Sequence, residues 1–256
     1  KKLIPLIPKD CKELGITGGE PTVLGDYFFE LLEIIKHELP FTEVHILTNG
    51  RSFALNAMAK KLSDINNPRI MLGIPLYSES YQIHDYVVQT KDAYYQTIMG
   101  IYNLKRYNIR IEIRVVLHKI TIPRLTKLAE FIYKNLPFVD QVVLMGLEVT
   151  GFTKPNIKEL WIDQNDYKLA LSETVQYLND RNIKSLIYNI PLCILPVEAW
   201  QYTAKSISDW KNLYLDECKK CIVSKECGGL FATSGSKQSE HIKAFNIDPR
   251  IEVIKQ

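Results

Sequence analysis

The sequence predicts an α/β fold in which parallel strands alternate with helices. Short apolar runs of strand length alternate with longer stretches of helical period from residue 13 to about residue 190. Repeated strand–helix–strand units connect parallel strands through crossover helices. The composition is that of a globular protein, with 46% hydrophobic and 24% charged residues in a chain of 256. Periodicity alone does not distinguish an open sheet from a barrel.

The first three elements illustrate the pattern. Residues 13–19 (ELGITGG) predict a strand that ends in glycines, and residues 43–50 (EVHILTNG) predict a second strand. Between them, residues 23–39 have apolar side chains at steps of three and four and therefore predict a helix. The same reasoning continues along the chain: it predicts strands at 69–78, 109–117, 139–147 and 184–190, and helices at 53–62, 93–107, 123–135 and 164–181.

The alternation stops near Cys193. The tail that follows is rich in Cys, Gly, Ser and Lys. We therefore expect a boundary between an α/β region, residues 1–192, and a cysteine-rich extension, residues 193–256.

Composition also narrows the classes of function. The 32 Lys and Arg residues against 29 Asp and Glu give a net charge of +3, too near balance to indicate a nucleic-acid or membrane partner. No run approaches the roughly 20 apolar residues that a membrane span requires. Three of the five cysteines lie within ten residues, which argues against a disulfide scaffold. We expect a cytoplasmic protein, because a reducing compartment suits such cysteines.

The strand at 109–117 carries charges on one face. Its aliphatic residues alternate with a second set that includes Arg110, Glu112 and Arg114, with His118 just beyond. Helices cover an apolar face, so the charged face must lie elsewhere: on a solvated edge strand, or in a polar barrel lumen that holds a charged ligand. We expect these four residues to share one face, with Arg114 and Glu112 looking into the barrel, because a slip by one residue would put charges under a helix.

Three further segments follow predicted strands and carry candidate ligand contacts. Gly18, Gly19, Glu20 and Pro21 form a turn whose glycines permit positive φ or close approach of a ligand. Asn49 precedes a glycine and is either a turn residue or a ligand contact, and Glu148 is a candidate for the lumen. No nucleophile elbow and no histidine metal spacing occur, so hydrolytic chemistry has no support.

The cysteine tail predicts a metal site. Cys218, Cys221 and Cys227 stand as C-x2-C-x5-C, followed by two glycines. Structural zinc and [4Fe–4S] clusters normally have four ligands. Cys193 is the best fourth ligand, because Cys11 lies at the far end of the chain. The spacing does not distinguish iron–sulfur from zinc, and free thiols or an oxidised pair are the alternatives.

Several of these stretches together resemble a known family. LGITGGEPTVLGD, VHILTNG, the segment from IHDYVVQ to RIEIRVVL, and FVDQVVLMGLEVTG resemble successive strands of radical SAM enzymes over about residues 13–151. GIPLYS, EIRVVLH, LMGLEVTGF, SISDWKN and the cysteine tail are similar to the His-Xaa-Ser system radical SAM maturases, which are associated with peptide modification.

The resemblance implies a partial (β/α)6 barrel of the TIM type that binds a [4Fe–4S] cluster and S-adenosylmethionine. The cluster would cleave S-adenosylmethionine reductively to a 5′-deoxyadenosyl radical. Gly18, Gly19 and Glu20 would receive the methionine amino group, and Arg114 would bind its carboxylate. The cysteine tail would hold an auxiliary iron–sulfur cluster. The implied partners are a ribosomally made peptide, rich in His-x-Ser repeats, and an electron donor.

Three departures from the family pattern stand out. The CxxxCxxC motif is missing, and Cys11 stands alone, so we expect that the first strand and cluster loop are not part of this sequence or that the chain lacks the radical-generating cluster. Pro75 stands where relatives often have a serine, and Asp92-Ala93 replaces the usual Gly-Ser. The alternatives are a radical SAM enzyme acting on RNA or a small molecule, and a non-catalytic binding partner of the same fold.

Overall fold

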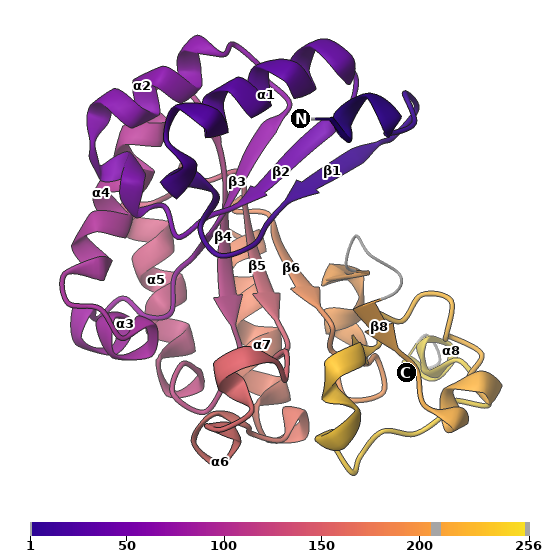
Figure 1. Ribbon diagram of the computed structural model, residues 1–256. Helices are drawn as coiled ribbons and strands as arrows, with labels where there is room; N and C mark the ends of the chain where they lie inside the picture. The colour runs from indigo at the N-terminus through magenta and orange to yellow at the C-terminus, as the bar shows by residue number, and fades with distance from the viewer. Residues whose placement is uncertain (1, 206–210, 254–256) are drawn as a thin grey trace. The chain divides into compact units, whose positions relative to one another are not determined.

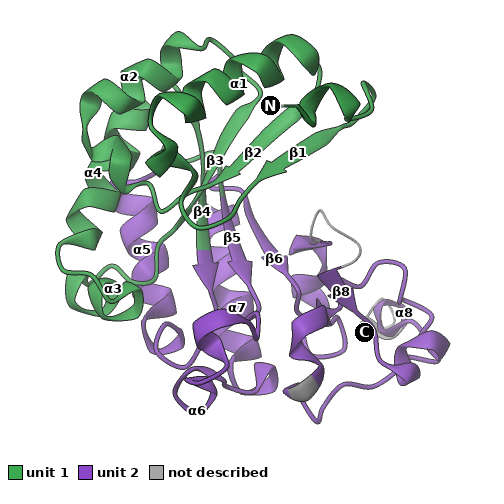
Figure 2. Cartoon of the chain, in the orientation of Figure 1, with its two compact units in different colours: residues 1–114, 138–141 green, residues 115–137, 142–256 purple. Residues whose placement is uncertain are grey.

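A computed structural model describes residues 2–205 and 211–253 (Figure 1). Most of the SISDWKN stretch, residues 206–210, lies outside the described residues. The chain divides into two compact units (Figure 2): a first unit of residues 1–114 and 138–141, and a second unit of residues 115–137 and 142–256. The boundary expected after residue 192 falls within the second unit and stays a prediction.

The first unit is built of parallel strands and the helices that cover one face of them (Figure 1). Neighbouring strands pair in chain order, from β1 to β4. The strands are β1 (Glu13–Ile16), β2 (Glu43–Leu47), β3 (Ile70–Pro75) and β4 (Arg110–Val116, of which the last two residues belong to the second unit). The helices are α1 (Asp26–Glu38), α2 (Asn56–Asp64), α3 (Tyr81–Val88) and α4 (Ala93–Arg106), with 3₁₀ turns η2 (Pro21–Leu24) and η3 (Arg51–Ala54).

Strand register separates an apolar face from a polar face in this unit. Ile46 of β2 is paired with Leu72 of β3, which is paired with Ile111 of β4, and all three side chains are buried. Successive side chains of a strand point to opposite faces. The intervening positions, among them His45, Gly73 and Glu112, therefore share the face that the helices do not cover. The predicted alternation of β4 is confirmed from Arg110 to Arg114.

Helix α3 was not predicted, because it is short and its apolar spacing is weak. Gln89, in the left-handed region with a φ of 53°, ends it. The carboxylate of Asp85 accepts hydrogen bonds from the backbone N–H groups of Asp92 (2.7 Å) and Tyr94 (2.8 Å), at the start of α4. These two hydrogen bonds between α3 and the start of α4 thus support a helix that its own apolar spacing predicts only weakly.

The second unit contains the remaining strands of the α/β pattern and the cysteine-rich tail. Its parallel strands are β5 (Gln141–Met145, of which Gln141 belongs to the first unit), β6 (Ser185–Tyr188) and β7 (Thr203–Ala204). An antiparallel pair, β8 (Asn212–Leu213) and β9 (Leu230–Phe231), lies in the tail. The helices are α5 (Leu125–Asn135), α6 (Ile157–Leu160), α7 (Gln164–Asn179) and α8 (Pro249–Val253).

The predicted fold class is confirmed. Within each unit the strands follow chain order, and the pairs β1–β2, β2–β3, β3–β4, β5–β6 and β6–β7 are all parallel. Among the described residues, every helix is too short or too polar to span a lipid bilayer.

We expect Gly100→Ala to destabilise the protein. Alanine in a helix is normally preferred over glycine by about 1 kcal/mol, but a Cβ at Gly100 of α4 would collide with the backbone carbonyl oxygen of Gly50. Overpacking of this kind typically costs about 1–3 kcal/mol. The matched control is Gly15→Ala, where an added Cβ meets no atom within 4 Å. Chemical denaturation of both variants would show equal midpoints if the close approach were unimportant.

Candidate functional site

The turn after β1 requires its two glycines. Gly18 and Gly19 have φ values of 110° and 44°, which lie in the region that side chains avoid. A Cβ at either position would meet no atom within 4 Å, so the space beside this backbone is open. Pro21 follows as the first residue of η2, where a missing N–H is tolerated. The turn therefore exposes bare backbone to any ligand that lies beside it.

The carboxylate of Glu20 holds this turn to the one that follows β2. Its Oε1 accepts hydrogen bonds from the backbone N–H of Thr22 (3.1 Å) and from the hydroxyls of Thr22 (2.7 Å) and Thr48 (2.6 Å). Its Oε2 accepts from the backbone N–H of Asn49 at 2.6 Å. Most of the acceptor capacity of the carboxylate is thus used inside the protein. Glu20 fixes the glycine turn through these four bonds.

Asn49 serves first as a turn residue. Its Oδ1 accepts a hydrogen bond from the backbone N–H of Arg51 at 2.9 Å, at the start of η3. Its amide Nδ2 makes no hydrogen bond with the described residues and remains available as a donor. A surface groove joins both turns to α4, and it is lined by Glu20, Val23, Asn49, Arg51, Ser52, Ala54, Leu55 and Gln96.

A polar cluster lies on the uncovered face of the first unit. Glu112 has no exposed surface, and its Oε1 is 3.2 Å from both His45 Nε2 and Arg114 Nε. Its Oε2 accepts a hydrogen bond from the Gln141 side-chain amide. On the far side of His45, Nδ1 is 3.4 Å from Glu13 Oε1. The solvated edge-strand interpretation of β4 is therefore wrong, because Glu112 is buried and partnered on the polar face.

Electrostatics within the cluster favour the charged forms. Burial opposes an imidazolium, but the Glu112 and Glu13 carboxylates outweigh it and raise the pKa of His45 to about 9. Burial also opposes the Glu112 carboxylate, but His45, Arg114 and Gln141 together hold its pKa below the usual value. The cluster thus contains two cations and two carboxylates at neutral pH.

Sequence reasoning singled out Arg114 and Glu112 but missed their partners. His45 was one histidine among several scattered ones, and Gln141 follows its partner by 29 residues. The signal for His45 was available in the alternation of EVHIL, where it shares a face with Glu43. Nothing local marks Gln141.

Two predicted residues lie outside this cluster. His118 comes after the end of β4, in a tight turn where its backbone N–H donates to the Thr121 hydroxyl at 3.0 Å. Because β4 ends at Val116, the expectation that His118 shares the polar face of the strand stays a prediction. Glu148 is half-buried in the segment after β5, in the second unit.

The four cysteines of the predicted metal site line one pocket in the second unit. The pocket walls include Cys193, Cys218, Cys221 and Cys227, together with apolar side chains such as Leu192, Val223, Ile242 and Phe245. Burial and the other three cysteines raise the pKa of Cys193 to about 11. All five cysteines of the chain are free thiols. Cys11 is remote in sequence, and its thiol donates to the carbonyl of Glu13 at 3.2 Å in the first unit.

Backbone N–H groups point at the sulfurs of this pocket. Leu192 and Gly229 each place a nitrogen 3.4 Å from Cys227 Sγ, and Phe245 does the same for Cys221 Sγ. Among the described residues, no three His, Cys, Asp or Glu side chains lie as close together as the ligands of one metal ion.

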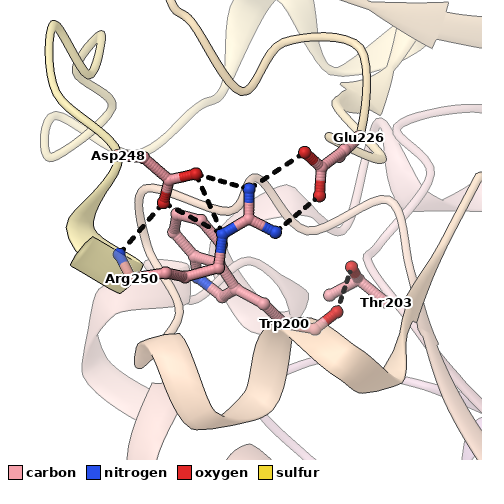
Figure 3. Close-up of polar contacts among 5 residues, drawn as sticks. All are labelled: Trp200, Thr203, Glu226, Asp248 and Arg250. Atoms are coloured by element: carbon pink, nitrogen blue, oxygen red, sulfur yellow. Dashed lines mark hydrogen bonds and ion pairs between the residues drawn. The ribbon is translucent and has the colours of Figure 1, made fainter. Parts of the chain in front are cut away.

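An arginine clamp secures the cysteine loop (Figure 3). Arg250 of α8 makes a bidentate pair with Glu226, at 2.9 and 3.0 Å, and also binds Asp248. Its guanidinium carbon is 5.5 Å from the centre of the Trp200 ring. Because Glu226 immediately precedes Cys227, the clamp connects α8 to the loop that carries Cys227.

Comparison with known proteins shows the family and the fold. The family described as the radical SAM superfamily matches residues 1–132. No curated protein matches the chain. Among solved structures, Streptococcus suis SuiB bound to its precursor peptide SuiA has a TM-score of 0.54 and 22% identity, over 68% of this chain and 38% of SuiB.

Two other solved structures extend the comparison. anSMEcpe with bound AdoMet has a TM-score of 0.61 and 15% identity, over 99% of this chain and 84% of that protein. Coproporphyrinogen III oxidase (HemN) from Escherichia coli, described as a radical SAM enzyme, has a TM-score of 0.51 and 15% identity, over 66% of this chain and 40% of HemN. These likenesses show an α/β half-barrel of parallel strands, as predicted. The chain spans less than half the length of SuiB.

The raised pKa of His45 predicts a pH-dependent stability. A histidine whose folded pKa is about 9, against about 6.5 when unfolded, stabilises the fold fully below pH 6.5 and loses that contribution as pH rises through 9. The full contribution is about 3 kcal/mol. We expect the free energy of unfolding of the wild type to fall between pH 6.5 and 9 relative to His45→Gln. Parallel curves for the two proteins, measured by urea denaturation, would contradict this.

Proposed function

The chain belongs to the radical SAM superfamily, and from this premise we propose that it is a peptide-modifying enzyme that binds S-adenosylmethionine in its first unit. The observation that carries the proposal is the open glycine turn of Gly18 and Gly19, fixed by the carboxylate of Glu20. The same unit holds Arg114 at the uncovered face of β4.

The chemistry of these groups suits a zwitterionic amino acid. Backbone carbonyls of residues 18–20 would accept hydrogen bonds from the methionine ammonium, and the Asn49 Nδ2 is a further donor beside the turn. The guanidinium of Arg114 would bind the carboxylate, since planar forks match carboxylates in a bidentate manner. Pro21 keeps the turn rigid. Glu148, in the second unit, stays a prediction from the sequence. Bound S-adenosylmethionine supplies, on reductive cleavage, a 5′-deoxyadenosyl radical that takes a hydrogen atom from the substrate.

The radical-generating [4Fe–4S] cluster of the superfamily needs three cysteines that these 256 residues do not provide. CxxxCxxC does not occur in them, and Cys11 is alone in the first unit. The residues present would therefore bind S-adenosylmethionine without ligating that cluster.

The pocket of Cys193, Cys218, Cys221 and Cys227 is proposed to hold an auxiliary iron–sulfur cluster. N–H groups directed at sulfur, as at Cys227 and Cys221, stabilise the charge of cluster thiolates. A zinc ion with Zn–S distances of about 2.3 Å would hold its four sulfurs about 3.8 Å apart. Zinc held by the same four thiolates is the alternative, because the cysteine spacing suits both metals.

A peptide is the proposed substrate. SuiB was crystallised with its precursor peptide and anSMEcpe with the Kp18Cys peptide. The resemblance to the His-Xaa-Ser maturases adds that the peptide is ribosomally made and rich in His-x-Ser repeats, with a separate electron donor. Five free cysteines suit the cytoplasm. The likeness to HemN keeps a small-molecule substrate as the second candidate.

Ligand binding tests the S-adenosylmethionine site. We expect the anaerobically purified chain to bind S-adenosylmethionine and its redox-inert analogue S-adenosylhomocysteine in calorimetry. Arg114→Ala should weaken both by about 1.5–3 kcal/mol, the usual loss for a charged hydrogen bond. No binding by the wild type would overturn the proposed function. Formation of 5′-deoxyadenosine would distinguish an enzyme from a non-catalytic binding partner, and that assay requires a chain that also carries the CxxxCxxC cysteines.

Metal analysis tests the cysteine pocket. We expect iron and acid-labile sulfide in protein reconstituted anaerobically, and Cys193→Ala should lower the bound metal. Cys11→Ala is the matched control and should leave the metal content unchanged, since Cys11 lies in the other unit. Zinc with no labile sulfide would favour the alternative metal. A disulfide between any two of the pocket cysteines in anaerobic protein would exclude the site.

A further inference from the structure

A buried carboxylate stands behind Arg114, and its partners come from separate strands. Glu112 is fully buried in β4, where an isolated charge would be strongly unfavourable. Its Oε1 contacts His45 Nε2 and Arg114 Nε, each at 3.2 Å, and its Oε2 accepts from Gln141. Both oxygens of Glu112 thus lie against protein groups, and the buried carboxylate presents no surface to a ligand.

The guanidinium of Arg114 is held at one end only. Its Nε contacts Glu112, whereas its two Nη groups make no hydrogen bond or ion pair with the described residues. The side chain keeps 15% of its surface exposed. Fixing the Nε edge restricts the plane and rotation of the fork, and the Nη edge keeps its donors for a carboxylate.

His45 fixes Glu112 from the opposite side. Its Nε2 faces Glu112 and its Nδ1 faces Glu13, so the imidazole is held between carboxylates of two different strands. The charged groups that face His45 are Glu13 from β1 and Glu112 and Arg114 from β4. A chain of contacts thus runs Glu13–His45–Glu112–Arg114 across the sheet.

Gly73 provides the room for this chain. It is paired with Glu112 in the register of β3 and β4. A Cβ at this position would lie 3.0 Å from His45 Nε2 and 3.1 Å from Arg114 Cδ, and 2.8 Å from Leu47 Cδ2. A Cβ here would require His45 and Arg114 to shift by a few tenths of an ångström, so the glycine is part of the geometry.

We propose that Glu112 and His45 are positioning residues that orient the Arg114 guanidinium for the carboxylate of a bound amino-acid moiety. This inference rests on the proposed binding of S-adenosylmethionine. Preorganising a donor reduces the conformational entropy lost when the ligand binds. Loss of either residue would therefore weaken the recognition of the carboxylate and not that of the adenosine.

Two ligands separate these effects in calorimetry. S-adenosylhomocysteine carries the amino-acid moiety, whereas 5′-methylthioadenosine has the same thioether and nucleoside without it. We expect Glu112→Gln and His45→Gln to weaken S-adenosylhomocysteine about tenfold, within the range of coupling between contacting residues. Binding of methylthioadenosine should stay within about twofold of wild type. Gly73→Ala should follow the same pattern.

A double-mutant cycle shows whether Glu112 acts through Arg114. Arg114→Ala combined with Glu112→Gln should bind S-adenosylhomocysteine no more weakly than Arg114→Ala alone. Additive losses, or equal losses for both ligands, would overturn the inference. If Glu112→Gln does not fold, as circular dichroism would show, His45→Gln in the same cycle decides the question.

The binding measurements separate the positioning role of Glu112 and His45 from the proposed function. Wild-type protein that binds neither ligand would remove the proposed function. Protein in which Arg114→Ala weakens binding while Glu112→Gln and His45→Gln do not would remove the positioning role alone.

Discussion

The burial of the Glu112 charge constrains the whole polar face of the first unit. A carboxylate without solvent must be compensated by cations and donors within reach. Here they come from β2, from β4 itself and from Gln141 at the start of β5. The parallel register of β1 to β4 brings His45 and Gly73 beside it. A change of register in any of these strands would leave a buried charge without its partners.

Side-chain hydrogen bonds within the protein also hold the turns that follow the strands. The Glu20 carboxylate accepts hydrogen bonds from the turns after β1 and β2, and the Asn49 side-chain carbonyl accepts one from the start of η3. Residues that a motif marks as ligand contacts thus have structural tasks as well. The groups that stay available to a ligand are the open backbone of Gly18 and Gly19 and the Asn49 side-chain Nδ2.

In the second unit, the cysteine-rich tail is stabilised by other interactions. Among the described residues, the strands of its tail, β7 to β9, have two residues each. Ion pairs such as Arg250–Glu226 (Figure 3) and N–H contacts to sulfur therefore add to the packing of buried apolar side chains, such as Val223 and Leu230, around the cysteine pocket. A metal cluster bound by four thiolates would add the cross-links that such a loop otherwise lacks.

The sequence by itself determined the strand and helix order, the glycine turn and the alternation of β4, because these depend on local periodicity and on residues close in the chain. It also grouped three of the four pocket cysteines by spacing. Only the tertiary structure decided that His45, Gly73 and Gln141 meet Glu112, since their sequence separations reach 67 residues and no local rule encodes them. Helix α3 was also visible only in the structure, because the Asp85 side chain supports it through hydrogen bonds to the start of the next helix, α4. The alternation along a strand determines which face of the sheet a side chain lies on, and the pairing with other strands determines which residues it contacts there.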